Sequence, residues 1–115
     1  MTRSMLSLVL IAGPIATAHA DSDADTEIRA LIQAVAESDC EFNRNGSRHS
    51  SETAAEHLEL KYSRGKRYAD SAEAFIERLA SKSSWSGEPY QLICDGEKQP
   101  AGDWLTMRLE ALSSQ

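Results

Sequence analysis

The sequence predicts an α+β domain in which three or four helices pack on a small antiparallel sheet of short hairpins. Apolar residues recur at helical spacing in four separate segments of the chain. Two dipeptides typical of hairpin turns, Asn45-Gly46 and Asp95-Gly96, each lie next to a short run with strand character. With 115 residues, the chain is long enough for one such domain and too short for two.

Residues 1–20 have the three parts of a cleavable secretory signal peptide. Arg3 supplies a positive charge, residues 5–12 form an uncharged apolar run, and Ala18-His19-Ala20 places small residues at the two positions that signal peptidase recognises. A retained anchor is the alternative, but the apolar run is too short to cross a bilayer. We therefore expect cleavage after Ala20, a periplasmic location, and one globular domain over residues 21–115 without stable membrane insertion.

The acidic composition disfavours nucleic acid as a partner. The whole sequence has 12 basic and 18 acidic residues, so its formal net charge is −6. Removing residues 1–20 takes away Arg3 and no acidic residue, which leaves 11 basic against 18 acidic residues and a net charge of −7. We expect a partner within the envelope, either a protein or a glycan that the sequence does not identify.

The first helix is expected to begin at Asp25, which can cap it, with residues 21–25 frayed at its start. It should end near residues 38–39. A hairpin follows, with residues 40–44 and 47–49 as its two arms. The inward face of the helix is predicted from apolar residues at i, i+3, i+4 and i+7: Ile28, Leu31, Ile32 and Val35.

Two further helices are predicted in the middle of the chain. The second begins at residue 50 or 51 and ends near Gly65. The third begins at residue 70 or 71, where Asp70 and Glu73 have the spacing of a capping box. The residues expected to face the core are Ala54, Leu58 and Tyr62 in the second helix, and Ala72, Phe75, Ile76 and Leu79 in the third.

The C-terminal part is predicted to be a loop, a second hairpin and a final helix. Residues 81–89 read as a loop because they are rich in serine, with one glycine and one proline. Residues 90–94 are predicted to be a strand that pairs with or lies beside residues 40–44, because Cys94 must reach Cys40. Pro100 ends this segment, and the last helix begins at about Asp103. Its inward residues are Trp104, Leu105, Leu109 and Leu112.

The two cysteines, Cys40 and Cys94, are expected to form a disulfide because the chain has two cysteines and an export signal. A free or redox-active thiol pair is the alternative. The chain has no Cys-x-x-Cys motif, which disfavours the redox interpretation.

His57 and Lys61 are the first candidate binding residues. At i and i+4 they share one face of the second helix, at the rim of its apolar stripe. There they can bind an anion or place an imidazole against a ligand. The structural alternative, which we favour at this stage, is a half-buried histidine hydrogen-bonded to a loop, with the lysine stem passing beside it.

The second candidate is residues 81–90, which we name the serine loop. Aromatic and hydroxyl side chains on a loop are typical of recognition surfaces. The alternative is an ordinary solvated turn with its tryptophan folded onto the domain. The residues that carry this prediction are Ser83, Trp85, Ser86 and Tyr90.

The third candidate is a basic turn after the second helix, formed by Lys61, Arg64, Lys66 and Arg67. It can contact anionic head groups or a phosphorylated saccharide. A solvated turn between helices is the alternative, and the sequence favours it.

No catalytic residues, cofactor or metal site are expected. Motifs for a nucleophile elbow or a phosphate-binding glycine loop do not occur in the sequence. His49 and His57 are eight residues apart, without the spacing of metal ligands.

Several longer motifs carry a family resemblance: Phe42-x-Arg44-Asn45-Gly46, Ala55-x-His57-Leu58-x-x-Lys61, Ala72-Glu73-x-Phe75-Ile76-x-x-Leu79-Ala80-Ser81-x-Ser83-x-x-Ser86-Gly87-x-Pro89-Tyr90, and Asp103-Trp104-Leu105. With these motifs the chain resembles the YfeK-like family of small exported proteins of Gram-negative bacteria, a domain family of unknown function. The resemblance implies a compact periplasmic domain and no known activity. It also singles out polar positions that packing alone does not require: Arg44, Asn45, His57, Lys61, Ser81, Ser83, Ser86 and Tyr90.

Three functions remain open from the sequence. The first is a small non-catalytic binding or interaction module of the cell envelope. The second is a structural or stress-related envelope protein without a ligand site. The third, and least favoured, is a small hydrolase-like enzyme in which His57 acts as general base next to Ser83 or Ser86.

Overall fold

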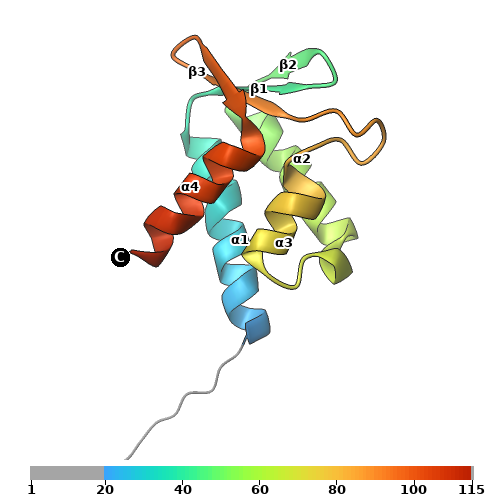
Figure 1. The fold of residues 1–115 in the computed structure, drawn as a ribbon, viewed down its shortest axis with the longest axis vertical. Coiled ribbons are helices and arrows are strands. Elements are labelled where there is room, and N and C mark those ends of the chain that lie inside the picture. Colours follow the sequence, from blue (N-terminus) through green and yellow to red (C-terminus); the bar gives the residue numbers. More distant parts are fainter. Residues whose placement is uncertain (1–19, 115) are drawn as a thin grey trace, which may run out of the picture.

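The structure, a computed structural model, describes residues 20–114 and confirms the α+β class. Four helices lie on one side of a four-stranded antiparallel sheet (Figure 1). Of the predicted signal peptide, residues 1–19 lie outside the described part of the chain. Within residues 20–114, no helix is both long enough and apolar enough to cross a membrane.

The sheet has the strand order β2-β1-β3-β4, and each neighbouring pair is antiparallel. The first hairpin consists of β1 (Glu41–Arg44) and β2 (Ser47–His49), and the second of β3 (Gln91–Cys94) and β4 (Glu97–Pro100). As predicted, the hairpins join through β1 and β3 at the centre of the sheet.

Both hairpin turns have the backbone that their sequences predict. The φ angles are 52° and 84° at Asn45 and Gly46, and 52° and 82° at Asp95 and Gly96. Positive φ at both central positions gives a turn whose twist matches that of the flanking strands. Asn and Asp tolerate this backbone and Gly adopts it without steric cost, so each pair fixes the register of its hairpin.

The four helices are α1 (Ala20–Glu37), α2 (Ser51–Arg64), α3 (Ala72–Phe75) and α4 (Ala101–Ser113). Two irregular segments accompany α3. A 3-10 turn, η1 (Lys66–Tyr68), precedes it, and a π-helical segment, η2 (Ile76–Ala80), continues it. The sequence predicted one regular helix in place of α3 and η2. Short π-helical turns inside helices are frequent near functional sites.

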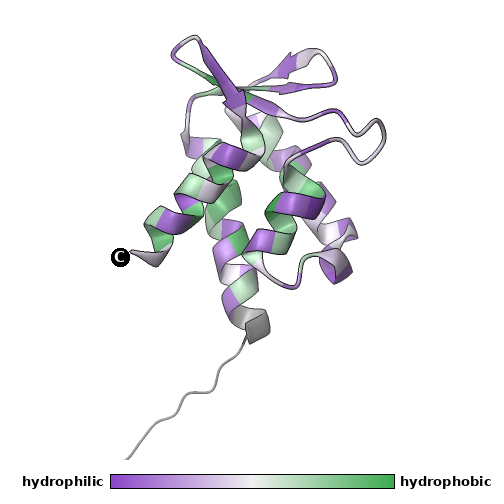
Figure 2. Cartoon of the chain, viewed as in Figure 1, coloured by the Kyte–Doolittle hydropathy of each residue, from purple (hydrophilic) through white to green (hydrophobic). Residues whose placement is uncertain are grey.

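The hydrophobic core lies between the sheet and the helices, whose apolar faces turn inward (Figure 2). Phe42 of β1 and Leu92 of β3 lie opposite each other and contribute the sheet side of this core. Each fully buried side chain of this size stabilises the fold by about 1.5–3 kcal/mol. The predicted inward residues of the first three helices are all buried, as are Leu105 and Leu109, while Trp104 and Leu112 are partly buried against the core.

The predicted start of the first helix was wrong. Asp25 is not a cap but an internal residue of α1, which begins at Ala20. The physical reason is tertiary: the Tyr62 hydroxyl donates to Asp25 Oδ1 at 2.6 Å, and Ala24 is buried against the core. These contacts stabilise a helical turn that we expected to fray.

The third helix begins where it was predicted to begin, but the expected capping box of Asp70 and Glu73 does not cap it. Ser71, rather than Asp70, caps α3, because its side chain accepts from the backbone N–H of Ala74. The final helix begins at Ala101 instead of near Asp103. Ala101 is buried and its N–H donates to the carbonyl of Tyr90 at 2.9 Å, so the helix starts directly where β4 ends.

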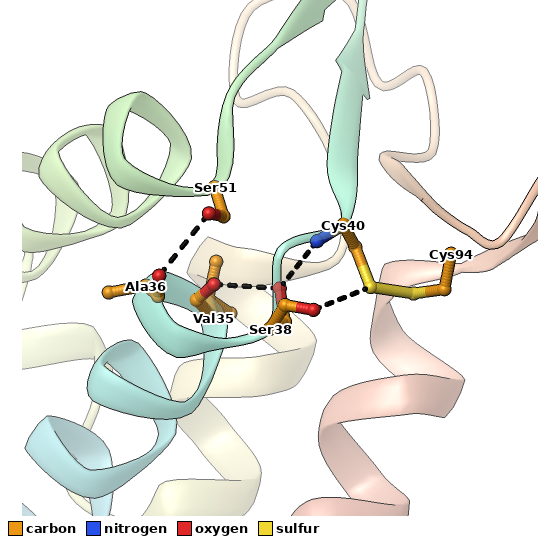
Figure 3. Close-up of a disulfide and its surroundings, with 6 residues drawn as sticks. All are labelled: Val35, Ala36, Ser38, Cys40, Ser51 and Cys94. Carbon is orange, nitrogen blue, oxygen red and sulfur yellow. Dashed lines mark hydrogen bonds between the residues drawn. A yellow bond between two sulfur atoms is a disulfide. The ribbon is translucent and has the colours of Figure 1, made fainter.

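The disulfide between Cys40 and Cys94 is present, as predicted, and joins the two central strands at one end (Figure 3). Ser38 positions Cys40: its hydroxyl donates to the Val35 carbonyl at 2.8 Å and accepts from the Cys40 N–H at 3.1 Å. Nearby, the Ser51 hydroxyl donates to the Ala36 carbonyl at 3.2 Å, which ties α2 to the end of α1. The opposite end of the central strand pair leads to the candidate site.

Candidate functional site

A groove of about 710 Å³ lies beside the end of the central strands that is remote from the disulfide. Its walls come from the β1–β2 turn, α2, η1, η2 and the serine loop. Gly65, at the C-terminal end of α2, allows α2 and η2 to approach closely. A Cβ atom there would lie 3.0 Å from Cδ2 of Leu79.

The groove is cationic, although the protein as a whole is acidic. Of the residues that line it, none is acidic. Among the described residues, ion pairs to carboxylates are formed by Arg29 and Arg48, neither of which lines the groove. The basic residues of the groove are therefore without a carboxylate partner in the described part of the chain: Arg44, Lys61, Arg64 and Arg78, with His57 among them.

His57 and Lys61 lie beside the Tyr90 ring at the inner wall of the groove. Both contact the Tyr90 hydroxyl, at 3.3 Å from His57 Nε2 and 3.1 Å from Lys61 Nζ. Lys61 Nζ also donates to the carbonyl of Lys82 at 3.1 Å. Because the hydroxyl accepts from the lysine, it can donate its own proton to the ring nitrogen of a neutral His57.

The pKa values of Lys61 and His57 are lowered first by burial and then by neighbouring positive charges. Burial, followed by the nearby charge of Arg44, lowers the pKa of Lys61 to about 8. Burial, followed by the charges of Arg44, Lys61 and His49, lowers the pKa of His57 to about 4. His57 is therefore neutral at pH 7. Lys61 is still mostly protonated at pH 7, but this pH lies close to its pKa.

The serines hold the serine loop in place. Ser83 is 5% exposed, and its Oγ accepts from the N–H groups of Trp85 and Ser86 at 3.1 Å each. It also accepts from Nδ2 of Asn45 at 3.3 Å, while the Ser86 hydroxyl donates to Oδ1 of Asn45 at 2.6 Å. One asparagine side chain thus connects the first hairpin turn to two points of the loop.

Trp85 stands at the tip of this anchored loop with 90% of its surface exposed. It lines the groove together with Tyr68, which is 47% exposed, and Tyr90, which is buried. The alternative that Trp85 folds onto the domain does not describe this structure. The groove thus has a cationic inner part and two exposed aromatic rings.

Most of the candidate residues converge on this groove. His57, Lys61, Ser83, Trp85 and Tyr90 line it, whereas Ser86 is attached to it through Asn45. The basic turn does not act as a unit. Two of its members, Lys61 and Arg64, line the groove. Lys66 lies over the Tyr62 ring and Arg67 over the Tyr68 ring, outside the groove lining.

Two groove residues, Tyr68 and Arg78, were missed by the sequence analysis. Tyr68 lies in a 3-10 turn that had no sequence signal, and Arg78 occupies a solvent-facing position of a predicted helix. An arginine at such a position is ordinary, so no local signal could have found it. Ser81, which the family resemblance singled out, accepts from the Tyr90 N–H through its backbone carbonyl at 2.9 Å.

The contact required by a hydrolase is not formed among the described residues. His57 bonds to Tyr90, while the hydroxyls of Ser83 and Ser86 bond to Asn45 and to the backbone of the serine loop. In residues 20–114, no group of three or more His, Cys, Asp or Glu side chains is placed to hold a metal ion.

Comparison with known proteins places the chain in a family. Residues 22–113 match a group described as "Family of unknown function (DUF5329)". The uncharacterized protein YfeK of Salmonella typhimurium is 40% identical over 76 residues, which cover 65% of this chain and 63% of YfeK. No solved structure matches the chain. The resemblance to YfeK-like proteins is thereby confirmed, and the chain belongs to the family of unknown function DUF5329.

Proposed function

We propose that this protein is an exported, non-catalytic binding module of the periplasm whose groove takes up an anionic ligand. The observation that carries the proposal is the cluster of Arg44, Lys61, Arg64 and Arg78 around a concavity that no carboxylate lines. A groove of about 710 Å³ is in the range typical of small-molecule sites.

The electrostatics of the groove support an anion as the ligand. Burial, followed by the charge of Arg44, lowers the pKa values of both Lys61 and His57, so a positive charge is unfavourable at these positions in the free protein. The chain has 18 acidic residues that could neutralise its cations, and Arg29 and Arg48 are paired in this way. A bound phosphate or carboxylate would supply the missing counter-charge and form charge-assisted hydrogen bonds.

The other two functions are supported less well. A structural envelope protein without a ligand would be expected to have a convex surface beside the serine loop, where this protein has a groove. A hydrolase would need His57 next to a serine hydroxyl, and His57 instead contacts Tyr90. We therefore retain the binding module as the proposal.

Calorimetric titration with inorganic phosphate tests the anion site. We expect the double variant Arg44→Gln, Lys61→Gln to bind phosphate at least tenfold more weakly than the wild type. The matched control is Arg48→Gln, Lys98→Gln, which removes two cations from exposed positions of the sheet outside the groove lining. If both double variants bind phosphate alike, the groove is not the anion site.

Mass spectrometry of the protein purified from the periplasm of a Gram-negative host tests export. We expect a polypeptide that begins at Asp21, with both cysteines protected from alkylation unless a reductant is added. A chain that retains Met1 and stays in the cytoplasmic fraction would contradict the periplasmic location. That result would not bear on the anion site, which the phosphate titration tests separately.

A further inference from the structure

We infer that the ligand of the groove is a saccharide that carries a phosphate or carboxylate group. This inference rests on the proposed anion site and adds a second point of recognition. The anionic group is placed at the inner end, between Arg44 and Lys61, and the sugar ring is placed against the indole of Trp85 at the rim.

The inner end offers a concentrated set of donors for an anion. Lys61 Nζ lies 4.9 Å from the centre of the Tyr90 ring, and its two hydrogen-bond acceptors are neutral oxygens, so its charge is not cancelled. Arg44 leaves the end of β1 directly at this wall and acts on Lys61, His57 and Tyr90 through its charge. An anion that enters here meets both cations at once.

The rim offers a flat apolar surface on a loop whose backbone is held in place. A single exposed tryptophan is not unusual on a protein surface. Trp85, however, lines the groove, and the Ser83 and Asn45 hydrogen bonds hold its loop before any ligand arrives. A loop whose backbone is already ordered loses less conformational entropy on binding than a free one. The face of the indole suits the apolar C–H face of a sugar ring, while polar groups nearby can bond to sugar hydroxyls.

The size of the groove favours a small organic anion over a bare ion or a protein partner. A volume of about 710 Å³ is far more than a bare phosphate ion fills, and it lies within the 300–1,000 Å³ typical of small-molecule sites. A protein partner would need a contact surface of about 800 Å² on each side, more than one concavity of this kind offers. A ring with several hydroxyls and one anionic substituent matches the chemistry of the lining, which has cations at the inner end and an indole at the rim.

Isothermal titration with a matched panel tests the inference. The panel contains glucose 6-phosphate and glucuronate as anionic sugars, inorganic phosphate and glycerol phosphate as anions without a ring, and methyl glucoside as a ring without charge. Vesicles of phosphatidylglycerol are the membrane arm. We expect an anionic sugar to bind at least tenfold more tightly than either ringless anion, and methyl glucoside to bind far more weakly.

Substitutions at the rim test whether the preference for an anionic sugar over a ringless anion depends on Trp85. Trp85→Ala is expected to weaken binding of the anionic sugar at least tenfold and so to reduce its preference over the ringless anions, because the substitution removes the exposed indole at the rim. Met107→Ala removes another exposed apolar side chain, on α4 and outside the groove lining, and is the matched control. In Trp104→Phe, Trp85 is the only tryptophan left, and its fluorescence should shift when the sugar binds.

The outcomes separate this inference from the proposed function. Equal affinities for the anionic sugars and the ringless anions would overturn the saccharide and leave the anion site standing. Stronger binding to phosphatidylglycerol vesicles than to any sugar would overturn it in favour of a membrane surface. If no anion in the panel binds, with or without a ring, both the inference and the anion site fail.

Discussion

The two hairpins of the sheet have the same kind of turn but are fastened to the rest of the protein in different ways. Asn45-Gly46 and Asp95-Gly96 have nearly the same backbone angles. The Asn45 side chain bonds to Ser83 and Ser86, whereas among the described residues Asp95 has no side-chain hydrogen bond. Instead, the strand before Asp95 ends in Cys94 and its disulfide.

The central strand pair therefore differs between its two ends. We call the end at Cys40 and Cys94 the covalent end and the end at Arg44 and Tyr90 the polar end. The disulfide closes the end at Cys40 and Cys94 covalently. At the other end, Arg44 and Tyr90 open onto the groove, where cations remain without carboxylate partners in the described chain. A covalent constraint at one end can offset the cost of the unpaired cations at the other, where we propose that a ligand binds.

The largest effect on stability is expected from removing the disulfide at the covalent end. Replacing Cys40 and Cys94 together by Ala should lower the free energy of unfolding by about 4 kcal/mol, because the bond closes a loop with a sequence separation of 54. Denaturant unfolding followed by circular dichroism measures this loss. Phosphate binding should be unchanged wherever the variant is still folded. A loss below about 1 kcal/mol would mean that the disulfide contributes little to stability, so that the covalent end is not the stabilising one.

The next largest effect on stability is expected from Asn45→Gly at the polar end, compared with the matched substitution Asp95→Gly next to the covalent end. Asn45→Gly and Asp95→Gly both keep the hairpin turn, because glycine readily adopts its backbone. Asn45→Gly also removes the bonds to Ser83 and Ser86, and we expect it to cost about 1–2 kcal/mol more than Asp95→Gly.

Hydrogen exchange of the Trp85 and Ser86 amides adds a local measurement to this pair. These amides donate to Ser83, whose position depends on Asn45, so exchange should accelerate in Asn45→Gly and not in Asp95→Gly. Equal unfolding energies and equal exchange rates in the two variants would show that the side chain of Asn45 contributes no more than that of Asp95.

The difference between the hairpins also indicates what the sequence could and could not predict. Both turns and the apolar helix faces were predictable because they depend on neighbouring residues. The start of α1 was not, because Asp25 is held by Tyr62, 37 residues away. The groove has the same origin: Asn45 meets Ser86 across a separation of 41 residues, and Tyr68 and Arg78 join them through packing between helices.

A smaller effect is expected from the titration of Lys61 at the polar end. Its pKa is about 8 in the free protein, and a bound anion favours the charged form. The affinity for phosphate should therefore fall as the pH rises above about 8. Lys61→Arg keeps the charge at high pH and should remove this fall. Titrations at pH 7 and pH 9.5 measure the effect, and an equal decline in both proteins would assign it to another group.

His57 gives a further pH effect, on stability rather than on binding. Burial and the charges of Arg44, Lys61 and His49 lower its pKa to about 4, from 6.5. Between these values the unfolded chain binds a proton that the folded protein does not, so stability should fall as the pH drops from 6.5 towards 4. His57→Gln should lose less stability over this interval than the wild type. Parallel curves for the two proteins, measured by urea unfolding, would contradict this assignment.

The smallest effect on stability is expected at the tip of the serine loop. Trp85 is 90% exposed, so Trp85→Ala should change the free energy of unfolding by less than about 0.5 kcal/mol. Trp104, which packs partly buried against the core, is the contrasting site, and Trp104→Ala should be clearly destabilising. Thermal unfolding of the two variants gives the comparison. A large loss in Trp85→Ala would mean that the indole stabilises the fold. The indole would then be part of the packed fold and not a free surface for a ligand. The polar end of the strand pair would stabilise the fold, as the covalent end does.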